Sequence, residues 1–191
     1  MTLRRRNLGV SGDPGGYREL MSGPEINTAR LWLRQFRAED LVPHRAAVDD
    51  DPAVTWAHER RPLAVSLRSW ADRLDEWQRD GFGMWIAEVA ATREVIGHCG
   101  LQRLEDGDEV EVGYYLGRAA WGQGYATEAA RASLAYGFDE CGLSSIVAVV
   151  RHENAASRHV LEKLGMRAER DGFFYGADAT LFRLHPGDLH R

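Results

Sequence analysis

The chain has little cysteine, no long apolar run and no excess of positive charge. Cys99 and Cys141 are its two thiols among 191 residues, too few for a disulfide framework, and neither has a metal-type spacing. No apolar run approaches the roughly 18 residues that span a bilayer. No apolar stretch follows the arginines at residues 4–6, so a secretory signal is not expected. We therefore expect a reduced, metal-free, cytoplasmic protein that does not bind membranes.

Charge and size narrow the class of protein further. The chain carries 24 Lys and Arg against 29 Asp and Glu, and this mild acidic excess argues against nucleic acid as the main partner. An anionic ligand would have to be held by local geometry, because the overall field does not attract it. With 44% hydrophobic and 28% charged residues, the composition is that of an ordinary globular protein.

Glycine and proline set residues 1–25 apart from the rest. This segment holds five glycines and two prolines, and we predict a flexible N-terminal tail there, with Met21 as an alternative start. Residues 26–191 are expected to form a single domain.

Hydrophobic periodicity predicts the order β α α β β β α β α β β. The expected strands are residues 29–36, 83–90, 95–101, 110–116, 145–150, 167–175 and 179–185. The expected helices are residues 40–48, 66–79, 126–140 and 155–164. This order predicts a mixed α/β fold, in which a twisted, mostly antiparallel sheet carries helices on both faces.

The most informative local pattern is WGQGYATEA at residues 121–129. Gly122 and Gly124 lie between an expected strand and a helix that begins near Ala126. The first turn of a helix has N–H groups without intrahelical partners and a partial positive charge. Because glycine has no Cβ, an oxyanion can approach this backbone closely. The pattern predicts a phosphate-bearing ligand.

Three interpretations of the glycine pair compete. A dinucleotide-binding G-x-G-x-x-G pattern fails at its third position, which is Thr127, and it comes too late in the chain for a second half. A plain turn is the usual role of an isolated glycine pair. The third interpretation is a pyrophosphate cradle of another kind, and the motifs around the loop favour it.

Four segments, in order, resemble the GNAT superfamily of N-acetyltransferases, and within it the RimJ/RimL-like branch. They are VGYYL at residues 112–116, WGQGYATEA at residues 121–129, HENAAS at residues 152–157 and VLEKLGM at residues 160–166. The opening TARLWLR at residues 28–34, followed by EDL at residues 39–41, resembles that branch's first strand and helix. The resemblance covers about residues 28–184. It implies a GNAT-like fold and the transfer of an acetyl group from acetyl-CoA to a primary amine, by direct attack in a ternary complex. The alternative is a non-catalytic acyl-CoA sensor or interaction module.

The resemblance also implies where acetyl-CoA binds. The family's Q/R-x-x-G-x-G/A loop falls on residues 121–126, with Trp121 in place of Gln or Arg, as looks usual in this branch. Backbone amides of the loop would hold the pyrophosphate, and the strand edge at residues 114–116 would bind the pantetheine arm like an added strand. The implied contacts are Tyr114, Tyr115, Leu116, Trp121, Gly122, Gln123, Gly124, Tyr125, Ala126, Thr127, Asn154 and Ser157. Without the resemblance, Asn154 reads as an ordinary helix N-cap.

Proton transfer would fall to residues on the flanking elements. The resemblance implies that Glu111 takes the amine proton, often through water, which works best with a pKa raised toward neutrality. A solvent-facing carboxylate is the alternative. His98 is either a second candidate base or a core histidine. Ser157 would protonate the departing CoA thiolate, with Tyr114 and Tyr115 as rivals.

The acceptor side is the least defined. The resemblance places it between the first two helices and the last hairpin, with Trp56, His58, Trp70, Trp77, Phe173, Phe174 and Tyr175 as candidates. The helical spacing of Trp70 and Trp77 is more often that of core residues than of a pocket. Asp171 and Asp178 would attract a cationic amine, and Arg131, Arg158 and Lys163 would meet CoA phosphates, unless these charges are simply solvated. The acceptor, a protein N-terminus or a small-molecule amine, stays open, as does the choice between monomer and homodimer.

Overall fold

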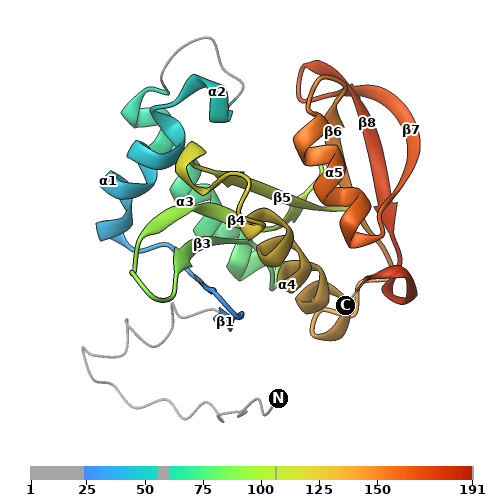
Figure 1. The fold of residues 1–191 in the computed structure, drawn as a ribbon, viewed down its shortest axis with the longest axis horizontal. Coiled ribbons are helices and arrows are strands. Elements are labelled where there is room, and N and C mark those ends of the chain that lie inside the picture. Colours follow the sequence, from blue (N-terminus) through green and yellow to red (C-terminus); the bar gives the residue numbers. More distant parts are fainter. Residues whose placement is uncertain (1–23, 56–60, 106, 191) are drawn as a thin grey trace.

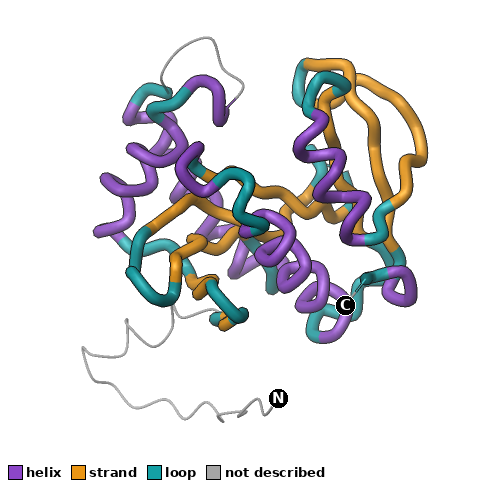
Figure 2. The backbone as a smooth tube through the Cα atoms, in the orientation of Figure 1, coloured by secondary structure: helices purple, strands orange, loops and turns teal. Residues whose placement is uncertain are grey.

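A computed structural model describes residues 24–55, 61–105 and 107–190. Its strands form one sheet with helices packed on both faces (Figures 1 and 2). The strands are β1 (Ile26–Asn27), β2 (Leu31–Arg34), β3 (Met84–Val89), β4 (Val95–Arg103), β5 (Val110–Leu116), β6 (Ile146–Arg151), β7 (Arg167–Phe174) and β8 (Ala177–Leu184). The helices are α1 (Leu41–His44), α2 (Pro52–Thr55), α3 (Leu63–Asp80), α4 (Tyr125–Asp139) and α5 (Ala155–Leu164). The predicted mixed, mostly antiparallel architecture is confirmed.

The order of strands across the sheet is β1-β2-β3-β4-β5-β6-β8-β7, and every neighbouring pair is antiparallel except β5 with β6. In the described chain, this parallel pair shares one register position, Glu111 opposite Val147. Residues 112–116 of β5 and 148–151 of β6 therefore diverge without pairing to each other. The sheet opens at its parallel junction, and β6, β7 and β8 continue it on the far side of the opening (Figure 1).

The two faces of the sheet are covered by different helices. Alternation along β4 and β5 places Cys99 on one face, where Ser133 of α4 contacts it, and His98 on the other. On that second face Trp70 of α3 packs with Ile86. In the described part of the chain, none of the helices is both long and apolar enough to cross a membrane.

The prediction of one continuous helix over residues 40–48 is wrong. The chain makes a 3-10 turn at Ala38–Asp40, the short helix α1, and then a π turn at Arg45–Asp49. The π turn is closed by the amide of Asp50, which donates to the Arg45 carbonyl five residues back, at 2.8 Å. The Arg45 guanidinium also donates to the Asp50 carboxylate, so the wide turn is held by side chains as well.

The second expected helix begins earlier than predicted. α3 starts at Leu63, directly after Pro62, where residue 66 was expected. Leu63 and Val65 leave about half of their side chains exposed, so the first turn does not show the buried periodicity on which the prediction depended. β1 at Ile26–Asn27 was not predicted either, and residues 1–23 of the expected tail lie outside the described residues.

Candidate functional site

The glycine loop joins β5 to the start of α4. Gly122 and Gly124 have φ of +73° and +81°, a left-handed conformation that costs other residues roughly 1–2 kcal/mol each. Gly124 is the N-cap of α4 and has no side-chain cap hydrogen bond, so the first amides of the helix lack a side-chain partner. Trp121, which replaces the family's polar residue, instead donates its indole N–H to the Leu116 carbonyl at 2.7 Å. The backbone cradle therefore keeps its shape despite Trp121.

A polar bracket from the N-terminal strands holds this loop in place. The carboxylate of Glu128, in the first turn of α4, accepts from the Thr28 hydroxyl at 2.6 Å and from the Arg30 amide and guanidinium at 2.8 and 2.7 Å. The Arg30 guanidinium also donates to the Gln123 carbonyl at 2.9 Å and lies 4.6 Å from the centre of the Tyr125 ring. Burial alone would raise the pKa of Glu128, but the hydrogen bonds from Thr28 and Arg30 lower it. Sequence reasoning missed Arg30, because its partners are about a hundred residues away.

Glu111 and Ser157, the two candidate proton-transfer residues, lie toward opposite faces of β5. Glu111 and Tyr115 share the face that α3 covers, as the alternation predicted. Tyr114 points the other way, toward α5, where its hydroxyl lies 2.7 Å from Ser157 Oγ. No hydrogen bond joins Glu111 to Ser157 in the described structure. A substrate between them would have to lie in the opening between β5 and β6.

Glu111 is buried, with 5% of its surface exposed, so the solvent-facing interpretation is wrong. Its Oε1 accepts from the Gln102 side-chain amide at 2.6 Å and from the Tyr175 hydroxyl at 2.9 Å. Its Oε2 is buried without a hydrogen-bond partner among the described residues. Burial raises the pKa of Glu111 to about 7, although the bonds from Gln102 and Tyr175 oppose the shift. A carboxylate in this state can accept a proton near neutral pH.

His98 is a buried core histidine in a fixed tautomer. Arg73 can only donate, so His98 Nε2, 3.3 Å from Arg73 Nη2, must accept. Its Nδ1 then donates to His44 Nε2 at 2.8 Å. Burial, together with Arg73 and His44, holds the pKa of His98 well below its ordinary value. Both ring nitrogens are engaged, which leaves neither ready to take a proton from an amine.

Asn154 and Ser157 meet at the start of α5. Asn154 is the N-cap, and its Oδ1 accepts from the Ser157 amide at 3.0 Å, which confirms the capping interpretation. The Ser157 side chain is then directed to the Tyr114 hydroxyl. Burial raises the pKa of Tyr114, although its hydrogen bond to Ser157 opposes the shift, so Tyr114 stays a neutral phenol. The two hydroxyls form one unit that can donate a proton from the α5 side of β5.

The residues expected on the acceptor side lie in different environments in the structure. Trp70 and Trp77 are buried in the core, where Trp70 packs on Phe36 at 4.8 Å and Trp77 donates to the Met84 carbonyl. Phe173 is 70% exposed. Tyr175 reaches Glu111, as described above. Trp56 and His58 lie outside the described residues.

The candidate charged residues mostly have partners of their own. Asp171 accepts from Thr180 of the same hairpin and pairs with His152, which follows β6, and Asp178 is exposed. Arg131 donates to the His190 carbonyl. The remaining two lie on α5: the Arg158 guanidinium lies over the Phe182 ring at 5.3 Å and Lys163 is exposed.

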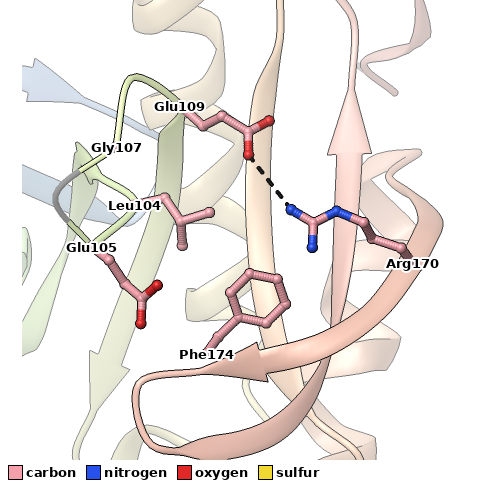
Figure 3. Close-up of a pocket in the computed structure, with 6 residues that line it drawn as sticks. All are labelled: Leu104, Glu105, Gly107, Glu109, Arg170 and Phe174. Atoms are coloured by element: carbon pink, nitrogen blue, oxygen red, sulfur yellow. Dashed lines mark ion pairs between the residues drawn. The ribbon is translucent and has the colours of Figure 1, made fainter.

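A pocket opens between the loop after β4 and the β7–β8 hairpin (Figure 3). It is lined by Leu104, Glu105, Gly107, Glu109, Arg170 and Phe174. Glu109 and Arg170 form an ion pair of 4.0 Å across it (Figure 3). None of the predicted acetyl-CoA contacts lines this pocket. Of the acceptor candidates that the structure describes, Phe174 is the one that does.

Comparison with known proteins defines the class. The fold and the loop at the start of α4 are those of an acyltransferase, and the model of the acetyltransferase (GNAT) domain matches residues 30–167. The chain therefore belongs to the GNAT acetyltransferase family, which confirms the family and the enzyme class expected from the sequence.

Relatives agree with this assignment. The chain is 40% identical over 149 residues to the uncharacterized N-acetyltransferase YnaD of Bacillus subtilis (strain 168), covering 78% of this chain and 85% of that protein. The crystal structure of an acetyltransferase from Agrobacterium tumefaciens str. C58 superposes with a TM-score of 0.76 at 26% identity, over 95% of this chain and 99% of that one. Mycobacterium smegmatis RimJ, in complex with CoA-disulfide, superposes with a TM-score of 0.67 at 22% identity, over 89% of each chain.

Proposed function

We propose that the protein transfers the acetyl group of acetyl-CoA to a primary amine, by direct attack of the amine in a ternary complex. The observation that carries this proposal is Glu111, a buried carboxylate with one unpartnered oxygen and a pKa raised to about 7. In the described chain, it lies at the one paired position of the parallel junction, where the sheet begins to open. A base at that point could reach an amine placed in the opening, directly or through a water.

The residues present fit acetyl-CoA as the donor. The left-handed glycines and the uncapped start of α4 would hold the pyrophosphate. The backbone edge of residues 114–116, which faces the opening and does not pair with β6, would hold the pantetheine arm as an added strand does. Acetyl-CoA would supply the thioester. RimJ of Mycobacterium smegmatis, with the same fold, was crystallised with CoA-disulfide.

The chain's own groups then handle two protons. Glu111, directly or through a water, removes one proton from the bound ammonium, so that the neutral amine can attack the thioester carbon, and its low solvent exposure keeps it a good base near pH 7. The remaining extra proton on the nitrogen of the adduct passes to solvent as the C–S bond breaks. Ser157, hydrogen-bonded to Tyr114, protonates the departing thiolate from the other side of β5. The loop and α4 contribute by holding the reactants together. Placement in the RimJ/RimL-like branch, a cytoplasmic location and a single domain over residues 26–191 complete the proposal.

A thiol-release assay tests this function. The protein is incubated with acetyl-CoA and a panel of amines that includes amino acids, polyamines and peptides with free N-termini, and free CoA thiol is followed over time. We expect amine-dependent release, matched by an equal amount of N-acetylated product. Acetyl-CoA that stabilises the protein against heat, without release on any amine, would favour the sensor or interaction module instead.

A further inference from the structure

Several polar atoms are buried without partners on the α3 side of the sheet. In the described chain, α3 holds three of them: Nε1 of Trp70, Nη1 of Arg73 and Oε2 of Glu76. Native proteins leave few buried polar atoms unpaired, and an unpaired guanidinium donor is among the least favourable. The exceptions often mark a place where another molecule binds.

Arg73 lies near the face of β5 that carries Glu111, the candidate base. Arg73 Nη2 donates to His98, and the His98 ring stacks on Tyr115 with centroids 5.3 Å apart and planes 26° apart. Tyr115 shares the face of β5 that carries Glu111, four residues before it. Burial raises the pKa of the Tyr115 hydroxyl, the charge of Glu111 raises it further, and the charge of Arg73 lowers it. Tyr115 therefore shares a strand face with the base and is connected to the guanidinium through the His98 ring.

The neighbouring carboxylates make no direct ion pair with Arg73 among the described residues, although the charges of Glu76 and Asp49 act on it. Asp49 accepts from the Ser66 hydroxyl at 2.6 Å and forms its ion pair with Arg61, at 3.5 Å. Glu76 comes three residues after Arg73 on α3, but no ion pair within 4.0 Å joins the two among the described residues. Burial raises the pKa of Glu76, although the charge of Arg73 opposes the shift. Arg61 adds a second positive charge near His98 and Tyr115.

We infer that Arg73 binds a carboxylate of the acceptor, so that the substrate class is an amine that also carries a carboxylate. This rests on the proposed function, because it identifies the molecule that enters the same site. Guanidinium groups bind carboxylates through two parallel hydrogen bonds, and one donor nitrogen of Arg73 has no other partner in the described structure. The amine of the acceptor would lie toward Glu111.

The spacing limits the length of this acceptor. Glu111 and Tyr115 are four residues apart on one strand, which is about 13 Å along the backbone. Since Arg73 meets His98 beside Tyr115, we expect the amine and the carboxylate of the acceptor to be separated by more than the one carbon of an α-amino acid. A short peptide places several bonds between its amine and its carboxylate. Diglycine and triglycine should therefore bind better than glycine.

Calorimetric titration tests the inference without requiring turnover. Glycine, diglycine, triglycine and their C-terminal amides are titrated into the full chain in the presence of CoA. We expect the diglycine or triglycine acid to bind about tenfold or more tightly than its amide, as a charge-assisted hydrogen bond implies. Arg73→Met should abolish this preference for the acid, and Arg73→Lys should retain part of it.

Arg68→Met is the matched control, since Arg68 lies on the same helix and is exposed. It should keep the full preference for the acid. Equal binding of acids and amides, or a preference that survives in folded Arg73→Met, would overturn the inference. Thiol release is then measured with the same probes. If the acids bind more tightly through Arg73 but no CoA thiol is released, the carboxylate site stands and acetyl transfer is refuted. If thiol is released equally from acids and amides, acetyl transfer stands and the carboxylate site is refuted.

Discussion

The phenolic hydroxyl of Tyr175 donates a hydrogen bond to Oε1 of Glu111 at 2.9 Å, across 64 residues of sequence. Tyr175 and Gly176 form the tip of the β7–β8 hairpin, both with positive φ, as a two-residue type I′ turn requires. The tip is anchored by Glu105, whose carboxylate accepts from the Tyr175 amide at 2.9 Å. The last hairpin thus holds the side chain that we propose as the base.

Removing this hydroxyl should make Glu111 a weaker acid. The bond from Tyr175 favours the charged carboxylate and lowers its pKa, so Tyr175→Phe should raise that pKa by about one unit. The pH profile of kcat/KM should move to higher pH by the same amount. Tyr136→Phe is the control, because Tyr136 bonds the Gly81 carbonyl instead. A profile that stays in place in Tyr175→Phe would show that Glu111 does not set it.

Replacing Glu111 should change how stability depends on pH. The folded state holds the Glu111 proton up to a pKa of about 7, whereas an ordinary Glu loses it near 4.5. Between these values the folded state binds more protons, so the wild type loses stability as pH rises. Glu111→Gln has no such loss. The difference in free energy of unfolding between Glu111→Gln and the wild type should therefore shift by about 3 kcal/mol in favour of the variant as the pH rises from 4.5 to 8. Urea unfolding at several pH values measures this difference.

His44 and His98 also titrate with depressed pKa values, but they are present in both proteins and cancel in the comparison. Glu94→Gln, at an exposed turn, is the control and should follow the wild type at every pH. A constant difference between Glu111→Gln and the wild type across this range would show that Glu111 is not protonated in the folded state near neutrality.

The glycine loop is tested by a pair of equally strained substitutions. Gly124 and Gly142 both have left-handed φ, +81° and +66°, one at the start of α4 and one beyond its end. Leucine at either position should lower stability by roughly 1–2 kcal/mol. Only Gly124→Leu should abolish acetyl-CoA binding, because only that side chain enters the proposed cradle. Calorimetric titration with acetyl-CoA decides; equal affinities in the two variants would refute the cradle.

Ser157 is tested by removing and then restoring its hydroxyl. Ser157→Ala should lower kcat by about tenfold or more, since proton transfer by a positioned group typically contributes at least that much. Ser157→Thr keeps a hydroxyl near Tyr114 and should recover most of the rate. If Tyr114→Phe proves more harmful than Ser157→Ala, then Tyr114 is the donor of the hydrogen-bonded pair.

Local patterns predicted most of the fold. β5 begins and ends at the residues that alternation indicated, and α5 spans the residues between its cap Asn154 and Gly165. The errors fall where local patterns carry no signal. The π turn at Arg45–Asp49 depends on a hydrogen bond that skips an extra residue, and the first turn of α3 has an exposed apolar surface.

The site was less predictable for a different reason. Glu111 could be named from its motif, but its burial depends on the β7–β8 hairpin that closes over it. Arg73 lies within an ordinary amphipathic helix, and nothing in the helix shows that its guanidinium meets His98 from β4. Such contacts depend on the pairing of distant segments, which periodicity does not encode.

The most direct test of the account is the pH dependence of acetyl transfer in the wild type and in Glu111→Gln. With a saturating amine whose own pKa lies well above the range, the wild-type rate of thiol release should rise to a plateau through an apparent pKa of about 7. Glu111→Gln should be slower by about a hundredfold and should lose that titration. An unchanged rate with an unchanged pH profile in Glu111→Gln would contradict the proposed chemistry.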